Sequence, residues 1–389
     1  MPTPIYLDHA ATTPLAPEVL AAMHPYLENE FANPSTLYQS GLACRKAIDS
    51  ARQTVAECLG ATAEQIVFTG SGTEANNLAI LGVTRAITQT PGHIITSQIE
   101  HPAVLEPCRA LEQQGWQVTY LPVNGEGFVS PDDLTAAIRP DTVLVSIMYG
   151  NNEVGALQPI AALGRICREH GAAFHTDAVQ VAGKLPIDLS ILPVDYLTVS
   201  SHKVYGPKGL GAFFIRENAT KPTPLIYGGG QEHGLRSGTE NVAAIVGFAQ
   251  GLELCCQEMD PERQRLLPLQ EKFITSLTQC AQDLGIPLTL NGPQNMTDRV
   301  PGNINVSFDG MTGEAMVVKL DLYGISVSSG SACHSAVIEP SHVLKAMGQS
   351  DEVALGTVRF SMGRRTTWED LDRVVQVLPK ILKTPALKR

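Results

Sequence analysis

The chain is organised around Asp195-Tyr-Leu-Thr-Val-Ser-Ser-His-Lys-Val-Tyr-Gly-Pro-Lys-Gly-Leu-Gly211. A short apolar run, typical of a buried strand, ends in two serines, a histidine and Lys203, and glycine and proline residues then end the strand. A lysine at this position is unusual, because removing an ammonium group from water is costly. The same desolvation lowers the pKa of the amine, and a neutral amine is a nucleophile that can form a Schiff base. The alternative is a surface lysine in a loop.

Composition restricts the class of protein. The length of 389 residues allows one large domain or, more commonly, two. The net charge is −11, from 28 basic and 39 acidic residues, and no basic cluster occurs apart from a few C-terminal lysines. We therefore expect neither nucleic acid nor a membrane as partner. No apolar run approaches the ~18–20 residues of a membrane span, and no secretory signal is expected at the N-terminus.

The eight cysteines show no Cys-x-x-Cys spacing. This pattern is typical of a reduced, cytoplasmic protein without a disulfide framework or a zinc module. We expect no metal site.

A second informative stretch is Gln65-Ile-Val-Phe-Thr-Gly-Ser-Gly-Thr73. It predicts a short strand, a glycine turn and the start of a helix, and a helix N-terminus offers N–H groups to a phosphate. The stretch matches neither Gly-x-Gly-x-x-Gly nor the P-loop, so a dinucleotide or nucleoside triphosphate is not indicated. A turn that only connects strand and helix remains the alternative.

Strand and helix patterns alternate over the first half of the chain, which favours an α/β fold with a mostly parallel sheet covered on both faces. Ligands of such sheets bind beyond the carboxyl ends of the strands. Five polar residues follow directly after predicted strands, so one cleft could hold them all: Thr73, His101, Asn152, Asp177 and Lys203.

The residue composition and the apolar pattern of the chain change after residue 216. A glycine-rich loop over residues 228–239 precedes a long amphipathic stretch over residues 242–284, and the remainder reads as a smaller α+β part. We predict a large domain over residues 15–258, and a small domain made of residues 1–14 and 259–389. The small residues around Cys333 cannot anchor their loop by packing, so we expect that loop to move.

These features together indicate pyridoxal phosphate as cofactor. It requires a lysine for the Schiff base, a carboxylate on the pyridinium nitrogen and a phosphate site, and an aromatic partner on the ring is common. These four needs are met, in the same order, by Lys203, Asp177, the glycine turn before Thr73, and His101. Taken singly, Asp177 could be a helix N-cap and His101 an ordinary loop histidine.

The chain resembles the cysteine desulfurases, which are pyridoxal-phosphate enzymes of the class V aminotransferase family with fold type I. The resemblance runs nearly end to end. The stretch from Ser331 to Leu344 is similar to the subgroup with a long cysteine loop, which includes enzymes that supply sulfur for iron–sulfur clusters. The segments that carry the resemblance are Tyr6-Leu-Asp-His-Ala-Ala-Thr-Thr-Pro14, Phe68-Thr-Gly-Ser-Gly-Thr-Glu-Ala-Asn-Asn77, Glu100-His101, Asn151-Asn-Glu-Val-Gly155, His175-Thr-Asp-Ala-Val-Gln180, Ser200-Ser-His-Lys-Val-Tyr-Gly-Pro-Lys-Gly209, Arg236-Ser-Gly-Thr239 and Ser329-Gly-Ser-Ala-Cys333.

The resemblance implies a large domain with a mostly parallel, seven-stranded sheet, a smaller α+β domain that carries the cysteine loop, and a homodimer. It also implies a role for each matching residue. Catalysis falls to Cys333 as nucleophile, Lys203 as Schiff-base lysine and proton carrier, and His101 as ring partner and acid–base. The remaining implied contacts are Asp177 to the pyridinium nitrogen, Gln180 to the ring hydroxyl, Gly72, Thr73, Ser200 and His202 to the phosphate, Thr239 to the phosphate in the partner subunit, and Asn152 and Arg359 to the substrate carboxylate.

The implied reaction converts L-cysteine to L-alanine and leaves the sulfur on Cys333 as a persulfide. Transient acceptor proteins, such as an iron–sulfur scaffold, would then take the sulfur. Two alternatives keep the cofactor, a selenocysteine lyase and a class V aminotransferase. A third is a non-enzymatic sulfur-relay or scaffold protein with the same fold.

Overall fold

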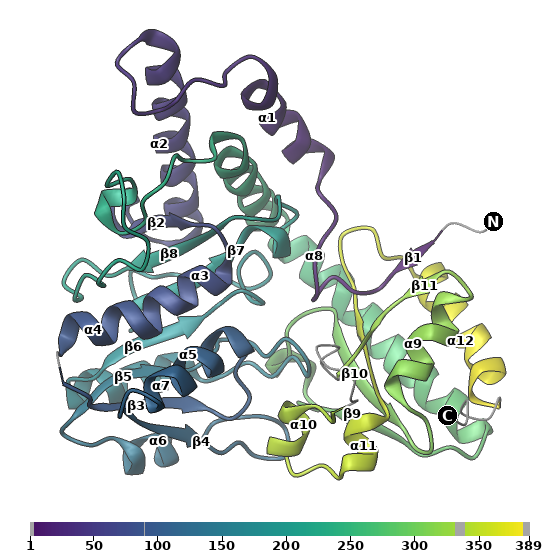
Figure 1. Ribbon diagram of the computed structural model, residues 1–389. Helices are drawn as coiled ribbons and strands as arrows, with labels where there is room; N and C mark the ends of the chain where they lie inside the picture. Colours follow the sequence, from purple (N-terminus) through teal and green to yellow (C-terminus); the bar gives the residue numbers. More distant parts are fainter. Residues whose placement is uncertain (1–3, 89, 331–338, 384–389) are drawn as a thin grey trace.

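A seven-stranded sheet forms the centre of the larger part of the molecule in the computed structural model, which describes residues 4–88, 90–330 and 339–383 (Figure 1). One strand, β8, runs antiparallel to both of its neighbours, and the other strand pairs are parallel. The expected mostly parallel α/β sheet is therefore confirmed. In spatial order its strands are β2 (Ile66–Thr69), β8 (Gly211–Ile215), β7 (Tyr196–Ser200), β6 (Ala173–Asp177), β5 (Thr142–Ser146), β3 (His93–Ser97) and β4 (Gln117–Leu121).

Both faces of this sheet are apolar, because successive strand residues point to opposite sides and both sides are covered by helices. Phe214 belongs to the core cluster under one set of helices, and its neighbour Phe213 to the cluster under the other set. The first set includes α2 (Gln39–Leu59), α6 (Pro131–Ala137), α7 (Ile160–His170) and the first half of α8 (Val242–Asp283). The second set includes α3 (Gly72–Asn77), a π-helical turn (Leu78–Gly82), α4 (Val83–Ile87) and α5 (Pro102–Glu112).

The N-terminal region differs in one respect from the sequence prediction. Residues 1–35 are rich in Pro, Ala and Asn, a composition that predicts an extended lead-in with short helical pieces, but α1 (Pro17–Glu28) is a helix of 12 residues. Its signal is weak because Pro25 interrupts the pattern and only two side chains of the helix are buried, Val19 and Met23. The helical pattern of residues 40–59 is followed by Gly60, which predicts a helix end there, and this end is confirmed because Gly60 follows α2 in a left-handed conformation with φ 65°.

The smaller part has an antiparallel four-stranded sheet and an apolar core of its own. The strands are β12 (Ser328–Ser329), β13 (Thr357–Ser361), β10 (Asn303–Phe308) and β9 (Leu288–Asn291), and the helices are α9 (Gly313–Asp321), α10 (His342–Ala346), α11 (Asp351–Leu355) and α12 (Trp368–Leu382). The N-terminal strand β1 (Ile5–Tyr6) pairs with β11 (Ile325–Ser326), so the start of the chain lies against this part.

The helix α8 connects the two parts and contains 42 residues. Phe248 and Leu252 in its first half pack in the core of the larger part, and Phe273 and Leu277 in its second half pack in the core of the smaller part. The proposed domain limit after residue 258 falls inside this helix and stays a prediction. Within the described ranges, none of the helices is both long enough and apolar enough to cross a bilayer.

Candidate active site

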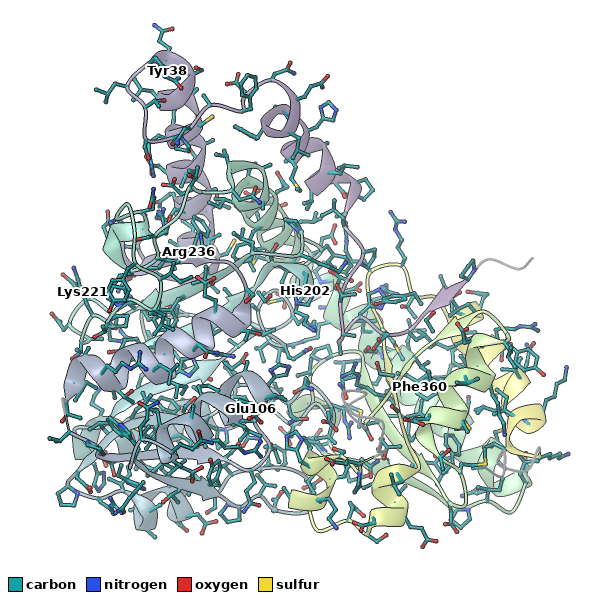
Figure 2. All side chains as sticks on the ribbon, in the orientation of Figure 1. Tyr38, Glu106, His202, Lys221, Arg236 and Phe360 are labelled. Carbon is teal, nitrogen blue, oxygen red and sulfur yellow. The ribbon has the colours of Figure 1, made fainter. Side chains whose placement is uncertain are left out.

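A pocket with an empty volume of about 950 Å³ lies at the carboxyl ends of the parallel strands. Figure 2 shows His202, one of its lining residues, near the junction with the smaller part, which contains Phe360. The exposed Thr239 does not line the pocket, and Cys333 lies outside the described residues. All other predicted site residues line it, namely Gly72, Thr73, His101, Asn152, Asp177, Gln180, Ser200, His202, Lys203 and Arg359.

Lys203 follows β7 in a short 3-10 turn, Ser201–Lys203. Its Nζ donates hydrogen bonds to the carbonyl oxygens of Ala10 at 2.5 Å and Ala11 at 2.6 Å. Burial, together with the positive charges of Arg359 and Lys184, lowers the pKa of the Lys203 amine to about 7. A large share of this amine is therefore neutral near pH 7, as a nucleophile or a proton acceptor requires.

Asp177 is held at the end of β6 by two donors. Asn76 Nδ2 donates to Asp177 Oδ2 at 2.6 Å, and the Val179 N–H donates to Asp177 Oδ1 at 2.9 Å. The carboxylate therefore caps a turn and lines the pocket. The alternative interpretation of Asp177 as a helix N-cap is wrong, because no helix among the described residues starts at this position. Sequence reasoning missed Asn76. Its signal was an amide side chain at a buried position of a helix, where a polar group needs a partner.

The phosphate end of the pocket is built by the turn after β2. Ser71 caps α3, since its Oγ accepts a hydrogen bond from the Glu74 N–H at 3.0 Å. Gly72 and Thr73 open the helix, where backbone N–H groups have no acceptor within the helix itself. A Cβ on Gly72 would lie 3.1 Å from Val179 Cγ2 and 3.2 Å from Ser200 Cβ, so the glycine permits a close approach of these segments.

Two histidines, His101 and His202, line the pocket. His101 is the N-cap of α5, and its Nδ1 accepts a hydrogen bond from the Ala103 N–H at 3.1 Å. A neutral ring with Nδ1 as acceptor carries its proton on Nε2. Burial, with the positive charges of Lys203 and Lys208, lowers the pKa of His202 to about 4, so this ring is neutral at pH 7.

Arg359 on β13 lies at the other end of the pocket. Its Nη2 bonds Asp8 Oδ1 at 2.8 Å, and its Nη1 donates to the carbonyl oxygen of Asn152 at 2.8 Å. Its Nε is buried and has no hydrogen-bond partner among the described residues. This orphaned donor suits a carboxylate ligand. Sequence reasoning missed Asp8, which lies far from Arg359 along the chain.

The pocket fits pyridoxal phosphate. It combines a desolvated amine, a fixed carboxylate and helix N–H groups, and Asn76 Oδ1 is a buried acceptor without a partner in the described part of the chain. Fold and site together define a pyridoxal-phosphate-dependent enzyme with the fold type I architecture.

Comparison with known proteins agrees with this class. The family model described as aminotransferase class-V matches residues 5–374, and the chain belongs to this family. A cysteine desulfurase IscS of Dictyoglomus turgidum is 49% identical over 97% of this chain and 94% of its own length. A solved structure named NifS-like protein superposes with a TM-score of 0.90 at 35% identity, covering 98% of this chain and 99% of its own. Another, titled SspA in complex with cysteine, has a TM-score of 0.80 at 38% identity and covers 92% of this chain and 98% of its own.

Proposed function

We propose that the protein is a cysteine desulfurase. It converts L-cysteine to L-alanine and passes the sulfur through Cys333 to acceptors that build iron–sulfur clusters and other sulfur-containing cofactors. The observation that carries this proposal is the meeting of Lys203, Asp177 and Arg359 in one pocket, in a chain whose relatives are named cysteine desulfurase. The printed title of a structural neighbour, in complex with cysteine, supports the substrate class.

Bound pyridoxal phosphate supplies a carbonyl carbon that condenses with amines and a ring that withdraws electrons from the substrate Cα. Lys203 is the amine that would hold its carbonyl carbon, and the carboxylate of Asp177 would face its ring nitrogen. His101 would stack on its ring. The other residues that would hold it are Gly72, Thr73, Ser200 and His202 at the phosphate, Gln180 at the ring hydroxyl, and Asn152.

Lys203 also moves the proton of the substrate Cα in this proposal. An amine with a pKa of about 7 accepts a proton and returns it with little free-energy cost at neutral pH. The carbonyl oxygens of Ala10 and Ala11 orient this amine, because both accept its hydrogen bonds. Arg359 binds the substrate carboxylate, for which its guanidinium offers a buried Nε that lacks a partner among the described residues.

Cys333 is the proposed sulfur acceptor, on the strength of the family resemblance. Its thiolate forms a bond to the substrate sulfur while the bond between that sulfur and Cβ breaks, and the electron pair of the broken bond stays with the carbon fragment. Protonation of that fragment yields alanine. A free thiol has a pKa of ~8.5, so positive neighbours must favour the thiolate.

We also propose a homodimer and transient sulfur-acceptor proteins as partners, and a cytoplasmic location. Apolar side chains exposed around α1 and α2 support a subunit interface there, including Leu27 at 62%, Phe31 at 80%, Leu37 at 90% and Tyr38 at 57% exposure. Tyr38 lies at the tip of this projection (Figure 2). In such a dimer the exposed Thr239 is available to the partner's phosphate site. Light scattering of the purified protein measures its mass and so distinguishes the proposed homodimer from a monomer.

The test of the function is a combined absorbance and product assay on purified protein. We expect a yellow chromophore that borohydride bleaches, and conversion of cysteine to alanine with one sulfide per alanine in the presence of a thiol reductant. Lys203→Ala should lose the chromophore, and Cys333→Ser should keep the chromophore but lose alanine formation.

The competing functions give other results. Exchange of amino groups with keto acids that survives in Cys333→Ser would identify an aminotransferase, and a much larger kcat/KM for selenocysteine than for cysteine would identify a selenocysteine lyase. A colourless protein without activity would support a scaffold.

We further propose that residues 334–338, next to Cys333, contribute to docking of the acceptor proteins. Deletion of these residues should impair sulfur transfer to an acceptor protein more than alanine formation, and equal losses would contradict this docking.

A further inference from the structure

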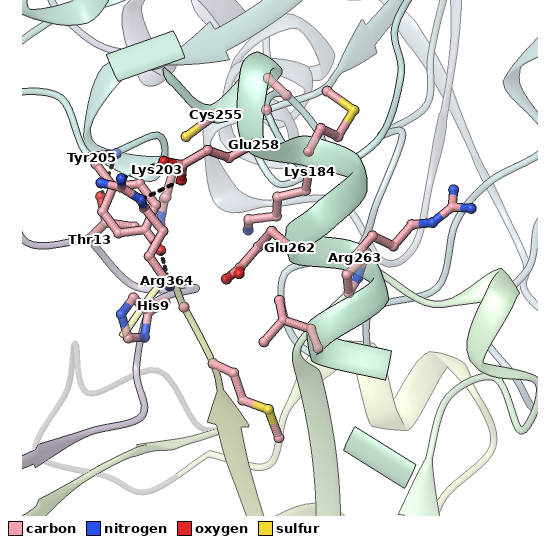
Figure 3. A pocket seen from close by; sticks show the side chains of 17 residues that line it. His9, Thr13, Lys184, Lys203, Tyr205, Cys255, Glu258, Glu262, Arg263 and Arg364 are labelled. Atoms are coloured by element: carbon pink, nitrogen blue, oxygen red, sulfur yellow. Dashed lines mark hydrogen bonds and ion pairs between the residues drawn. The ribbon is translucent and has the colours of Figure 1, made fainter. Parts of the chain in front are cut away.

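Lys203 lines a second, small cavity besides the cofactor pocket (Figure 3). The proposed chemistry assigns no role to this cavity. Lys184 reaches into it, and residues of α8 form much of its wall, among them Cys255, Glu258 and Glu262. A second half-buried lysine so near the cofactor lysine needs a physical explanation, because each partly desolvated ammonium opposes the other.

A single turn after β6 contributes lining side chains to both cavities. Gln180 lines the cofactor pocket and Lys184, four residues later, lines the second cavity. Gly183 makes this arrangement possible, since its φ of 71° is left-handed and a Cβ there would lie 2.7 Å from Cys255 Cβ. The turn therefore fixes the two side chains relative to each other.

The side chain of Lys184 contacts that of Gln180, with Nζ at 3.4 Å from Oε1. An ammonium group only donates hydrogen bonds, so it must meet the amide oxygen and not the amide nitrogen. Gln180 Nε2 then points the other way and donates to the carbonyl oxygen of Ala10 at 2.9 Å. The same carbonyl oxygen accepts the hydrogen bond of Lys203. A continuous chain of polar contacts thus connects Lys184 to Lys203.

We propose that Lys184 is a positioning residue for the cofactor lysine: it orients the Gln180 amide, and its charge in the second cavity opposes a second positive charge on Lys203. The inference rests on the proposed function in one respect, that Lys203 is the lysine that binds the cofactor. The orientation of Gln180 leaves the second hydrogen of Nε2 available for an acceptor in the pocket, where the ring hydroxyl of the cofactor is expected.

The acidic groups of the cavity do not neutralise Lys184. Both oxygens of Glu258 bond Arg364 at 2.7 Å, and both oxygens of Glu262 bond Arg265 at 2.7 and 2.8 Å. Across the described residues, no carboxylate lies within ion-pair distance of Lys184.

The other titratable groups that face the cavity are neutral or positive. Burial raises the pKa of Cys255 to about 12 and also raises that of Tyr205, while burial lowers the pKa of His9, so none of the three carries a charge near pH 7. Arg263 lies on the same wall and adds a positive charge. The ammonium of Lys184 therefore acts on Lys203 without a compensating partner.

The pKa values of the two lysines agree with this arrangement. Burial lowers the pKa of Lys184 to about 8, so it is still largely protonated at pH 7. Lys184 contributes to the lower pKa of Lys203, after burial and Arg359, while Asp8 and Asp177 act in the opposite direction. Loss of the Lys184 charge should therefore raise the pKa of Lys203.

The experiment measures the reactivity of the Lys203 amine in cofactor-free protein. Acetylation by limiting acetic anhydride is followed at a series of pH values, and the Lys203 peptide is quantified by mass spectrometry. In Lys184→Met we expect the midpoint for Lys203 to rise by about one pH unit, which lowers its reactivity near pH 7 severalfold. Lys184→Arg keeps charge and donor and should retain the wild-type midpoint. Lys221→Met, which removes the same charge from an exposed loop, should leave it unchanged.

The affinity of the cofactor-free protein for pyridoxal phosphate, followed by absorbance, is the second readout. It should fall severalfold in Lys184→Met and recover in Lys184→Arg. An unchanged Lys203 midpoint in Lys184→Met overturns the inference. Should that variant not fold, Lys184→Gln removes the charge with a polar side chain, and an unchanged midpoint there has the same meaning. A wild-type midpoint near that of an ordinary lysine, ~10.4, would instead contradict the role of Lys203 in the proposed function.

Discussion

Asn76 and Asp177 are joined by a hydrogen bond of 2.6 Å between Nδ2 and Oδ2, across 101 positions of the chain. The bond connects the helix that follows the phosphate turn to the end of β6. Two parts of the cofactor pocket are thereby held in one geometry before any ligand binds. Preorganisation of this kind reduces the free-energy cost of binding, because fewer groups must become ordered at that moment.

Replacing Asn76 by leucine should loosen this part of the pocket. The Asp177 carboxylate would keep the Val179 N–H but lose its other donor, which we expect to lower the free energy of unfolding by about 1–3 kcal/mol. Cofactor affinity should fall as well, because Asp177 is no longer oriented. Urea unfolding of the cofactor-free variant and absorbance titration measure the two effects. Asn218→Leu, at an exposed position, is the control, and equal affinities in both variants would contradict this role of Asn76.

A lysine at position 359 should weaken substrate binding. Arg359 uses its two terminal nitrogens for Asp8 and for the carbonyl oxygen of Asn152, and only a planar guanidinium offers a third donor in a fixed direction. In Arg359→Lys we expect KM for cysteine to rise about 10–100-fold with a smaller change in kcat. Steady-state alanine formation measures both constants, with Arg165→Lys as an exposed control. A fall in kcat at constant KM would show that the guanidinium acts after binding.

The sequence predicted the positions at which site residues follow strands, because strand ends are local features of the chain. Thr73, His101, Asn152 and Lys203 each follow a strand as expected, and they line one pocket because the carboxyl ends of parallel strands share one edge.

The contacts that orient those residues were not predicted from the chain. Asp8 and Arg359 pair across 351 positions, and Lys184 reaches Lys203 through Gln180 and a backbone carbonyl. Such contacts depend on tertiary packing and leave no local pattern. The length of the helix α1 was underestimated for a different reason, since few of its side chains are buried and its apolar pattern is correspondingly weak.

Glu100 should make stability depend on pH in an unusual direction. The side chain is fully buried, Ser97 Oγ and the Met148 N–H both donate to its Oε1, and burial raises its pKa to about 8. Between pH 4.5 and 8 the folded protein thus holds a proton that the unfolded chain releases, so this group lowers stability as the pH rises through that window.

Glu100→Gln removes this titration. We compare the free energy of unfolding of the variant with that of the wild type. This difference should rise in favour of the variant by on the order of 2–4 kcal/mol between pH 5 and 8, and it should stay constant at higher pH. Urea unfolding at pH 5, 6.5 and 8 measures the trend. Glu106→Gln on the exposed side of α5 should run parallel to the wild type. Parallel curves for Glu100→Gln as well would mean that Glu100 is ionised in the folded protein.

The turn that carries Gln180 and Lys184 can be tested through two glycines with nearly the same backbone conformation. Gly183 has φ 71° and Gly171 has φ 72°, but a Cβ would lie 2.7 Å from Cys255 Cβ in the first case and would meet no atom within 4 Å in the second. Alanine at Gly171 should therefore cost only the strain of the left-handed conformation, about 1 kcal/mol.

Alanine at Gly183 bears the same strain and must also displace α8 or the turn itself. We expect its free energy of unfolding to fall by about 2–4 kcal/mol, and the Lys203 midpoint of the cofactor-free protein to shift because Gln180 and Lys184 move together. Urea unfolding and the acetylation profile of Lys203 measure these effects in both variants. Equal losses of stability in the two variants would show that the turn around Gly183 accommodates the added Cβ without further strain. A Lys203 midpoint that stays at the wild-type value in Gly183→Ala would show that this turn does not position the cofactor lysine.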